Sequence, residues 1–120
     1  MAPEPDDETD ARPLLTLLGD EYVQAILAAT SEAPKSAKDL SNELDTARST
    51  IYRRADEMQV YDLLVERTKI MADGSHHRVY EANVDHLDID LDGGEFAVRV
   101  QTRTTPADRF TKIWNDIREA

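Results

Sequence analysis

The sequence predicts a small α+β domain in which helices come first and two β-hairpins follow. Apolar residues recur at helical spacing as far as Tyr61, and beyond it they alternate with polar residues. Asp73-Gly74 and Asp92-Gly93-Gly94 each separate two alternating runs, which is typical of hairpin turns. A chain of 120 residues has room for one domain with short arms.

Two helices with a short turn between them are predicted from Ser36 to Tyr61. Ser36 followed by Asp39 has the spacing of a capping box. Asp45-Thr46 favours a turn because both side chains compete for local backbone hydrogen bonds. A short helix, a turn and a second helix are the components of a helix-turn-helix. Apolar side chains at helical spacing form the two inward faces: Ala37, Leu40 and Leu44 in the first helix, and Ala47, Ile51, Ala55 and Met58 in the second.

The outward face of the second helix carries groups that can bind DNA. Arg48 and Arg53 are the best candidates for reading bases, because arginine can bind guanine bidentately and each such pair discriminates by about 1–3 kcal/mol. A competing interpretation pairs Arg53 with Glu57 within the helix, although this order of charges is the weaker one. Four neighbouring groups complete the predicted contact set on this helix: Ser49 and Tyr52 for bases or phosphates, and Thr50 and Arg54 for the DNA backbone. Tyr52 has the alternative role of covering the edge of the core.

A β-hairpin over residues 65–83 follows this helix, with its return strand at 77–83. The position of the hairpin is that of the wing in a winged helix. Lys69, His77 and Arg78 are predicted to reach the DNA backbone from it, and the alternative is that all three are solvated.

The segment Leu44-Asp45-Thr46-Ala47-Arg48-Ser49-Thr50-Ile51-Tyr52-Arg53-Arg54 resembles the recognition segment of ArsR-like winged helix-turn-helix regulators. The likeness is strongest to the acidic versions found in salt-loving archaea, and it extends from about Leu14 to the C-terminus. It implies that the positions of Arg48, Ser49, Tyr52 and Arg53 face the major groove. Two positions depart from the usual pattern: Ala47 stands where a capping serine is common, and Asp62 stands where a glycine usually ends the helix.

The overall charge is unfavourable for a DNA-binding protein. The chain has 25 acidic and 14 basic residues, a net charge of −11. Residues 47–78 carry a net charge of +1, and the remainder carries −12. The excess of aspartate, and of arginine over lysine, indicates adaptation to molar salt, where the Debye length is about 3 Å and distant repulsion is screened. The acidic surface therefore says more about the salt concentration of the solvent than about the binding partner.

The two ends of the chain are predicted to be an acidic disordered arm at 1–12 and a dimerisation region. Residues 13–86 form the predicted DNA-binding domain, and 87–120 the second hairpin and a terminal helix. That hairpin could extend the wing sheet or form a layer of its own. The terminal helix starts at Thr105-Pro106 and could pack on its own domain or on a second copy. The predicted dimer interface comprises Leu14, Leu17, Leu18, Phe110, Ile113, Trp114 and Ile117.

Several other functions find little support in the sequence. With no cysteine, the chain has no disulfide or thiolate metal site of its own. Asp85-His86 could suggest a metal, but one imidazole beside loop acids is common without one. No phosphate-binding glycine loop or nucleophile motif occurs, so an enzyme is not expected. No apolar run is long enough to span a membrane.

These observations together predict a winged helix-turn-helix protein with a β-hairpin wing, a second C-terminal hairpin and a C-terminal helix. We expect a cytoplasmic, homodimeric regulator that binds double-stranded DNA, with no cofactor, metal or small-molecule ligand. The alternative is a protein–protein adaptor that keeps the scaffold without reading DNA.

Overall fold

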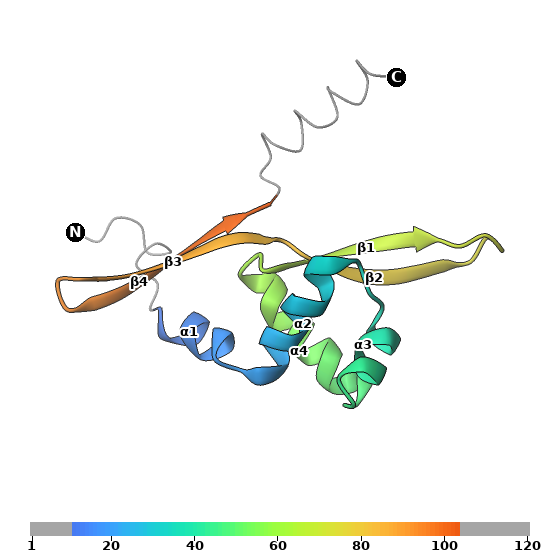
Figure 1. The fold of residues 1–120 in the computed structure, drawn as a ribbon, viewed down its shortest axis with the longest axis horizontal. Coiled ribbons are helices and arrows are strands. Elements are labelled where there is room, and N and C mark those ends of the chain that lie inside the picture. Colours follow the sequence, from blue (N-terminus) through green and yellow to red (C-terminus); the bar gives the residue numbers. More distant parts are fainter. Residues whose placement is uncertain (1–10, 104–120) are drawn as a thin grey trace, which may run out of the picture.

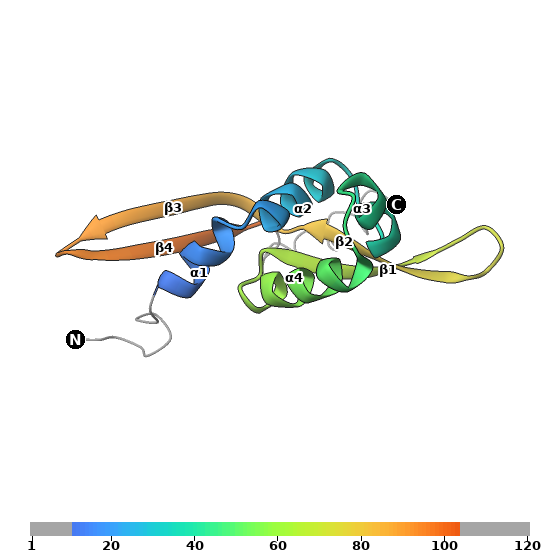
Figure 2. The ribbon, with the colours of Figure 1, turned by 90° about the horizontal axis from the view of Figure 1, so that it is seen from below.

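The structure, a computed structural model, describes residues 11–103 and has an α+β architecture with the helices first. Two antiparallel hairpins follow the helices and extend to opposite ends of the molecule (Figures 1 and 2). The predicted α+β class, with helices followed by two hairpins, is thus confirmed, and the predicted terminal helix from Thr105 onward lies outside the described residues. The elements are α1 Arg12–Leu18, α2 Glu21–Glu32, α3 Ala37–Glu43, α4 Arg48–Val60, β1 Leu64–Ile70, β2 His76–Ala82, β3 Val84–Asp92 and β4 Glu95–Thr102.

The helix starts follow the capping chemistry of the sequence. The Asp20 carboxylate accepts hydrogen bonds from the amides of Tyr22 and Val23, at 2.9 and 3.0 Å, and so caps α2. The predicted capping box of α3 is present, because the Ser36 hydroxyl accepts from the Asp39 amide at 3.0 Å and the Asp39 carboxylate accepts in return at 3.3 Å. Ala47, at the N-cap of α4, provides no side-chain hydrogen bond.

The core lies between the helices and the first hairpin. Leu64 and Tyr80 come from β1 and β2, and they meet apolar side chains from all four helices. The fully buried members include Val23, Ile26, Leu40, Ile51, Ala55, Met58 and Leu63. Helical spacing therefore identified the inward faces of α3 and α4, except at Ala47, which was predicted to face inward but is exposed at the N-cap of α4, before the first helical turn.

An isolated β-bridge between Lys35 and Tyr80, which the sequence analysis did not anticipate, ties the helices to the first hairpin. The Lys35 amide donates to the Tyr80 carbonyl at 3.0 Å, and the Tyr80 amide donates to the Lys35 carbonyl at 2.7 Å. This exchange fixes the connection between α2 and α3 at the edge of β2. The start of α3 is consequently held beside the hairpin.

The β1–β2 hairpin turns at Asp73-Gly74, as predicted. The Met71 amide donates to the Ser75 carbonyl at 2.8 Å, which closes a three-residue loop, and Gly74 has a φ of 87°. Its strands begin and end one residue away from the predicted positions. Strand β1 begins at Leu64 instead of residue 65, and β2 spans His76–Ala82 instead of 77–83. Asn83 is buried at the junction after β2, where its side chain donates to the Asp62 carbonyl at 3.1 Å.

The second hairpin forms a sheet of its own, which decides between the two predicted alternatives. Its strands pair only with each other among the described residues. The predicted border between residues 86 and 87 falls inside β3.

Helix α1 corrects part of the predicted dimer interface. Leu14 and Leu17 are only 7% and 8% exposed, because they pack into the core of their own chain. Neither is available to a second copy, whereas Leu18 is half-buried. Residues 1–12 are described only from Ala11 onward, and the predicted interface residues Phe110, Ile113, Trp114 and Ile117 lie outside the described residues.

Asp62→Gly is expected to stabilise the protein by about 0.5–1 kcal/mol, because a non-glycine residue in the left-handed region is strained. Asp62 has a φ of 60° directly after α4. The control is Asp56→Gly, the same substitution on the exposed side of α4, which should lower stability by a few tenths of a kcal/mol. Urea unfolding measures the free energy of unfolding of both variants. Equal changes in the two variants would contradict backbone strain at Asp62.

Candidate nucleic-acid interface

The first two turns of α4 present polar side chains outward and apolar ones inward. Ile51 is fully buried, whereas Arg48, Ser49, Tyr52 and Arg53 are exposed. This division follows from the helical repeat, since Arg48 and Tyr52 are four residues apart, and so are Ser49 and Arg53. The predicted outward face is thus open to solvent in the single chain.

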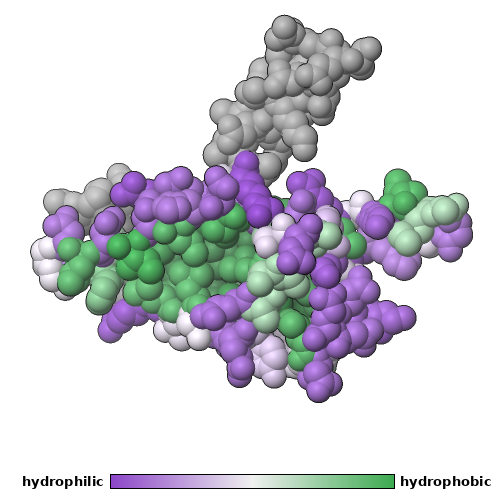
Figure 3. All heavy atoms as spheres, viewed as in Figure 1, coloured by the Kyte–Doolittle hydropathy of each residue, from purple (hydrophilic) through white to green (hydrophobic). Residues whose placement is uncertain are grey.

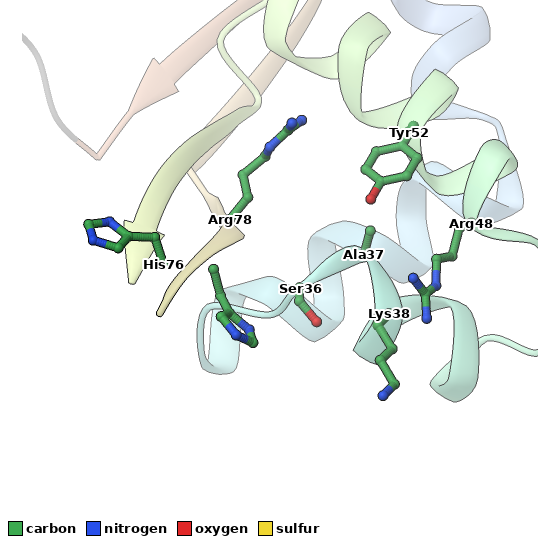
Figure 4. Close-up of a pocket in the computed structure, with 8 residues that line it drawn as sticks. Ser36, Ala37, Lys38, Arg48, Tyr52, His76 and Arg78 are labelled. Atoms are coloured by element: carbon green, nitrogen blue, oxygen red, sulfur yellow. The ribbon is translucent and has the colours of Figure 1, made fainter. Parts of the chain in front are cut away.

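An open groove of about 380 Å³ lies between the start of α3, the start of α4 and strand β2. Figure 4 shows Arg48 and Tyr52 entering it from α4, and Arg78 and His76 coming from the hairpin strand. The remaining lining residues are Ser36, Ala37, Lys38 and His77. Three segments that are separated in sequence therefore converge on one polar surface.

The groove is cationic, in contrast to the chain as a whole. Lys38, Arg48 and Arg78 line it, and none of its described lining residues is a carboxylate. Such a surface favours an anionic ligand, and its open shape and polar side chains suit a phosphate backbone.

Arg78 links the hairpin to α4. Its guanidinium carbon lies 5.9 Å from the centre of the Tyr52 ring, within the range of a cation–π contact. Its Nε lies 3.3 Å from the Glu66 carboxylate. Interaction with the Tyr80 hydroxyl, followed by the charge of Glu66, raises the pKa of Arg78. The ion pair offsets part of the charge, yet the Arg78 side chain is still 58% exposed.

The structure brings some predicted contact residues together and separates others. Arg48, Tyr52, His77 and Arg78 meet at the groove, while Ser49 and Arg53 form the adjoining exposed stripe of α4. Ala47 is exposed at the helix start and Thr50 is half-buried. Lys69 is exposed and directly opposite His77 in the strand register, and Arg78 is one residue further along β2.

Arg54 has an internal role instead of the predicted contact with the DNA backbone. Its Nη2 lies 3.0 Å from the Asp20 carboxylate at the start of α2, and its Nη1 lies 3.6 Å from Glu57. Glu57 is therefore paired with Arg54, and not with Arg53 as the competing interpretation had it. No local pattern indicates the Arg54–Asp20 contact, because the two residues are 34 positions apart.

Lys38 is the cation of the groove that the sequence analysis missed, and Ser36, Ala37 and His76 are further lining residues that were not predicted as contacts. Lys38 lies in the first turn of α3, two residues after the capping serine, and its exposed cationic side chain was the available signal. That this turn faces the hairpin depends on the Lys35–Tyr80 pairing, which no local pattern predicts.

Asp20→Asn is expected to keep the cap of α2 but to remove its ion pair with Arg54. Burial opposes ionisation, but the hydrogen bonds from the Val23 amide and Arg54 together outweigh it, so the pKa of Asp20 is lowered from 3.8. A lowered folded-state pKa gives stability that is present above the ordinary value and is lost as the pH falls through the folded one. At pH 7 the variant should lose about 0.5–1 kcal/mol.

Urea unfolding of both proteins at neutral and acid pH tests this expectation. The difference in unfolding free energy should be constant above about pH 4.5 and should shrink below pH 3.8. A difference that does not vary with pH would show that the charge of Asp20 is not what stabilises α2.

His86 is engaged within its own hairpin. Its Nε2 lies 2.9 Å from the Asp88 carboxylate, whose other oxygen accepts from the Gln101 amide at 3.1 Å. The hydrogen bond with His86 is the main cause that lowers the pKa of Asp88. Over residues 11–103, no group of three histidine, aspartate or glutamate side chains is arranged to hold a metal.

Comparison with known proteins adds no family assignment. No model of a protein family matches the chain, and no curated protein matches it either. In the part of the chain that the structure describes, no helix is both long and apolar enough to cross a bilayer.

Proposed function

We propose that this chain is a sequence-specific DNA-binding transcription regulator with a winged helix-turn-helix fold, acting as a homodimer on double-stranded DNA. The observation that carries the proposal is the exposed face of α4 formed by Arg48, Ser49, Tyr52 and Arg53. It lies beside a groove whose described lining residues include three cations and no carboxylate. Helix α4 is the reading helix in the major groove. The β1–β2 hairpin is the wing that lies along the flanking backbone.

The order of the elements supports this assignment. A helix pair with a short turn precedes the hairpin, and an isolated β-bridge joins Lys35 to Tyr80 at the edge of the hairpin. The Tyr52–Arg78 contact holds the wing against the reading helix, so that both can meet one duplex. Two copies would place their reading helices in successive major grooves about 34 Å apart.

Each kind of contact has a separate task in this mechanism. Arg48 and Arg53 read base edges, with Ser49 and Tyr52 as additional donors. Lys38, Lys69 and Arg78 contact phosphates, which fixes the position of the protein on the duplex without specifying sequence. Molar salt screens the repulsion between phosphates and the distant acidic surface, so contacts at the groove dominate.

Selection from a library of random duplexes in molar KCl tests the proposal. We expect enrichment of a two-fold symmetric site, and a binding constant that falls with rising salt as the bound phosphates regain their counterions. Recovery of no preferred sequence and no duplex binding at any salt concentration would contradict the function.

A second candidate is a protein–protein adaptor on the same scaffold, which the net charge of −11 favours. An adaptor has no need for two exposed arginines, Arg48 and Arg53, on the outward face of α4. The same selection separates the two candidates, because an adaptor would enrich no duplex.

A further inference from the structure

One face of the β3–β4 hairpin is apolar between residues 87 and 100. Because side chains alternate along a strand, directly paired residues share a face, and three successive pairs are apolar on both strands. The opposite face is polar, and there Asp90 lies 3.7 Å from Arg99. The apolar pairs are Leu87 with Val100, Ile89 with Val98, and Leu91 with Phe96.

The chain covers only the inner half of this face. Leu87, Val98 and Val100 pack against the core, and α1 contacts β4. The outer half is open, with Ile89, Leu91 and Phe96 exposed at 54%, 66% and 56%. Figure 3 shows apolar side chains gathered over this end of the molecule. A two-stranded hairpin with an open apolar face is marginally stable in water, so a covering partner would stabilise it.

We propose that the apolar face of β3–β4 is the interface between two copies of this chain. The proposal rests on the pairing of two copies that the proposed function requires, and it names the surface. The face carries no charge, and Asp88, Asp90 and Asp92 lie on the opposite side of the hairpin. Two copies with a net charge of −11 each can therefore approach along this face without bringing its carboxylates together.

The shape of the face suits contact with itself. A two-fold interface uses the same patch on both partners, and an uncharged row of apolar side chains can pack on its own copy without burying a charge. Two hairpins stacked face to face form two layers about 10 Å apart. Leu18 is half-buried on α1, the helix that contacts β4.

The position of the hairpin also suits the proposed function. The β3–β4 hairpin extends to the end of the molecule opposite to the wing, in both views (Figures 1 and 2). Pairing through it leaves the groove and the outer face of α4 free in both copies. Pairing through the acidic remainder of the surface would not keep the groove and the outer face of α4 free in this way.

The test compares Phe96→Lys with Ala97→Lys in the full chain. These neighbours lie on opposite faces of β4, and both are exposed, so the two variants add the same charge at adjacent strand positions but on different sides. Sedimentation equilibrium in molar KCl measures the dimer dissociation constant, and circular dichroism checks the fold. The wild type, with a chain mass of 13.5 kDa, should sediment at twice that mass.

We expect Phe96→Lys to raise the dimer dissociation constant by about 30-fold or more, as for loss of a central aromatic contact, and Ala97→Lys to leave it unchanged. Equal effects of the two variants would overturn the proposal. A wild type that stays monomeric would also overturn it, and the face would then be covered by residues 104–120 of the same chain or by another protein. The measurement uses no DNA, so it can fail or succeed independently of DNA binding.

Discussion

Replacing either Arg48 or Arg53 by alanine is expected to weaken binding to the selected duplex by about 5- to 150-fold, the equivalent of 1–3 kcal/mol for one bidentate contact with a base. Both arginines are exposed on α4, and Arg48 lines the groove. If they read bases, the loss should be large on the selected site and small on unrelated duplexes, because a base contact is made only with the correct sequence. Fluorescence anisotropy with both duplexes measures the two affinities.

Arg99→Ala is the matched control for these variants. It removes the same charge from the β3–β4 hairpin, where Arg99 is 70% exposed and lies near Asp90. Its affinity for the selected duplex should match that of the wild type. If Arg99→Ala weakens binding as much as the α4 variants do, total charge and not the α4 face determines affinity. If neither α4 variant changes affinity, the assigned reading face is wrong.

Ile51→Ala should destabilise the domain by about 2–5 kcal/mol, the usual cost of a cavity at a buried isoleucine. Ile51 is fully buried on the inward side of α4 and belongs to the main core. This is a large part of the 5–15 kcal/mol that typically stabilises a small domain. Urea unfolding followed by circular dichroism gives the change in unfolding free energy.

Val60→Ala is the control on the same helix, because Val60 is 74% exposed and should contribute less than about 0.5 kcal/mol. Ile51→Val, at about 0.5–1.5 kcal/mol, provides a measurable value if the alanine variant does not fold. Equal losses for Ile51→Ala and Val60→Ala would mean that α4 is not packed on its Ile51 side.

The local elements were predictable because each depends on residues close together in the chain. Ser36 and Asp39 are three residues apart, so their capping box needs no distant partner. The apolar repeat through Ile51, Ala55 and Met58 likewise identified the inward side of α4. Asp73-Gly74 located the first hairpin turn for the same reason.

The contacts between elements could not be predicted in this way. Leu14 and Leu17 have the pattern of a docking stripe, but the pattern does not say whether the partner is the same chain or a second copy. Arg54 looks like its neighbour Arg53 in the sequence, and only the approach of α2 turns it into an internal partner of Asp20.

By itself the sequence determined the order of helices and hairpins, the caps, and the cationic outward face of α4, since these follow from spacing along one segment. Only the tertiary structure decided that Lys38, Arg48 and Arg78 share a groove, that the second hairpin stands apart from the first, and that its outer apolar face is left open. The physical reason is that periodicity specifies which side of an element avoids water, while the surface that covers it is chosen by packing of the whole chain.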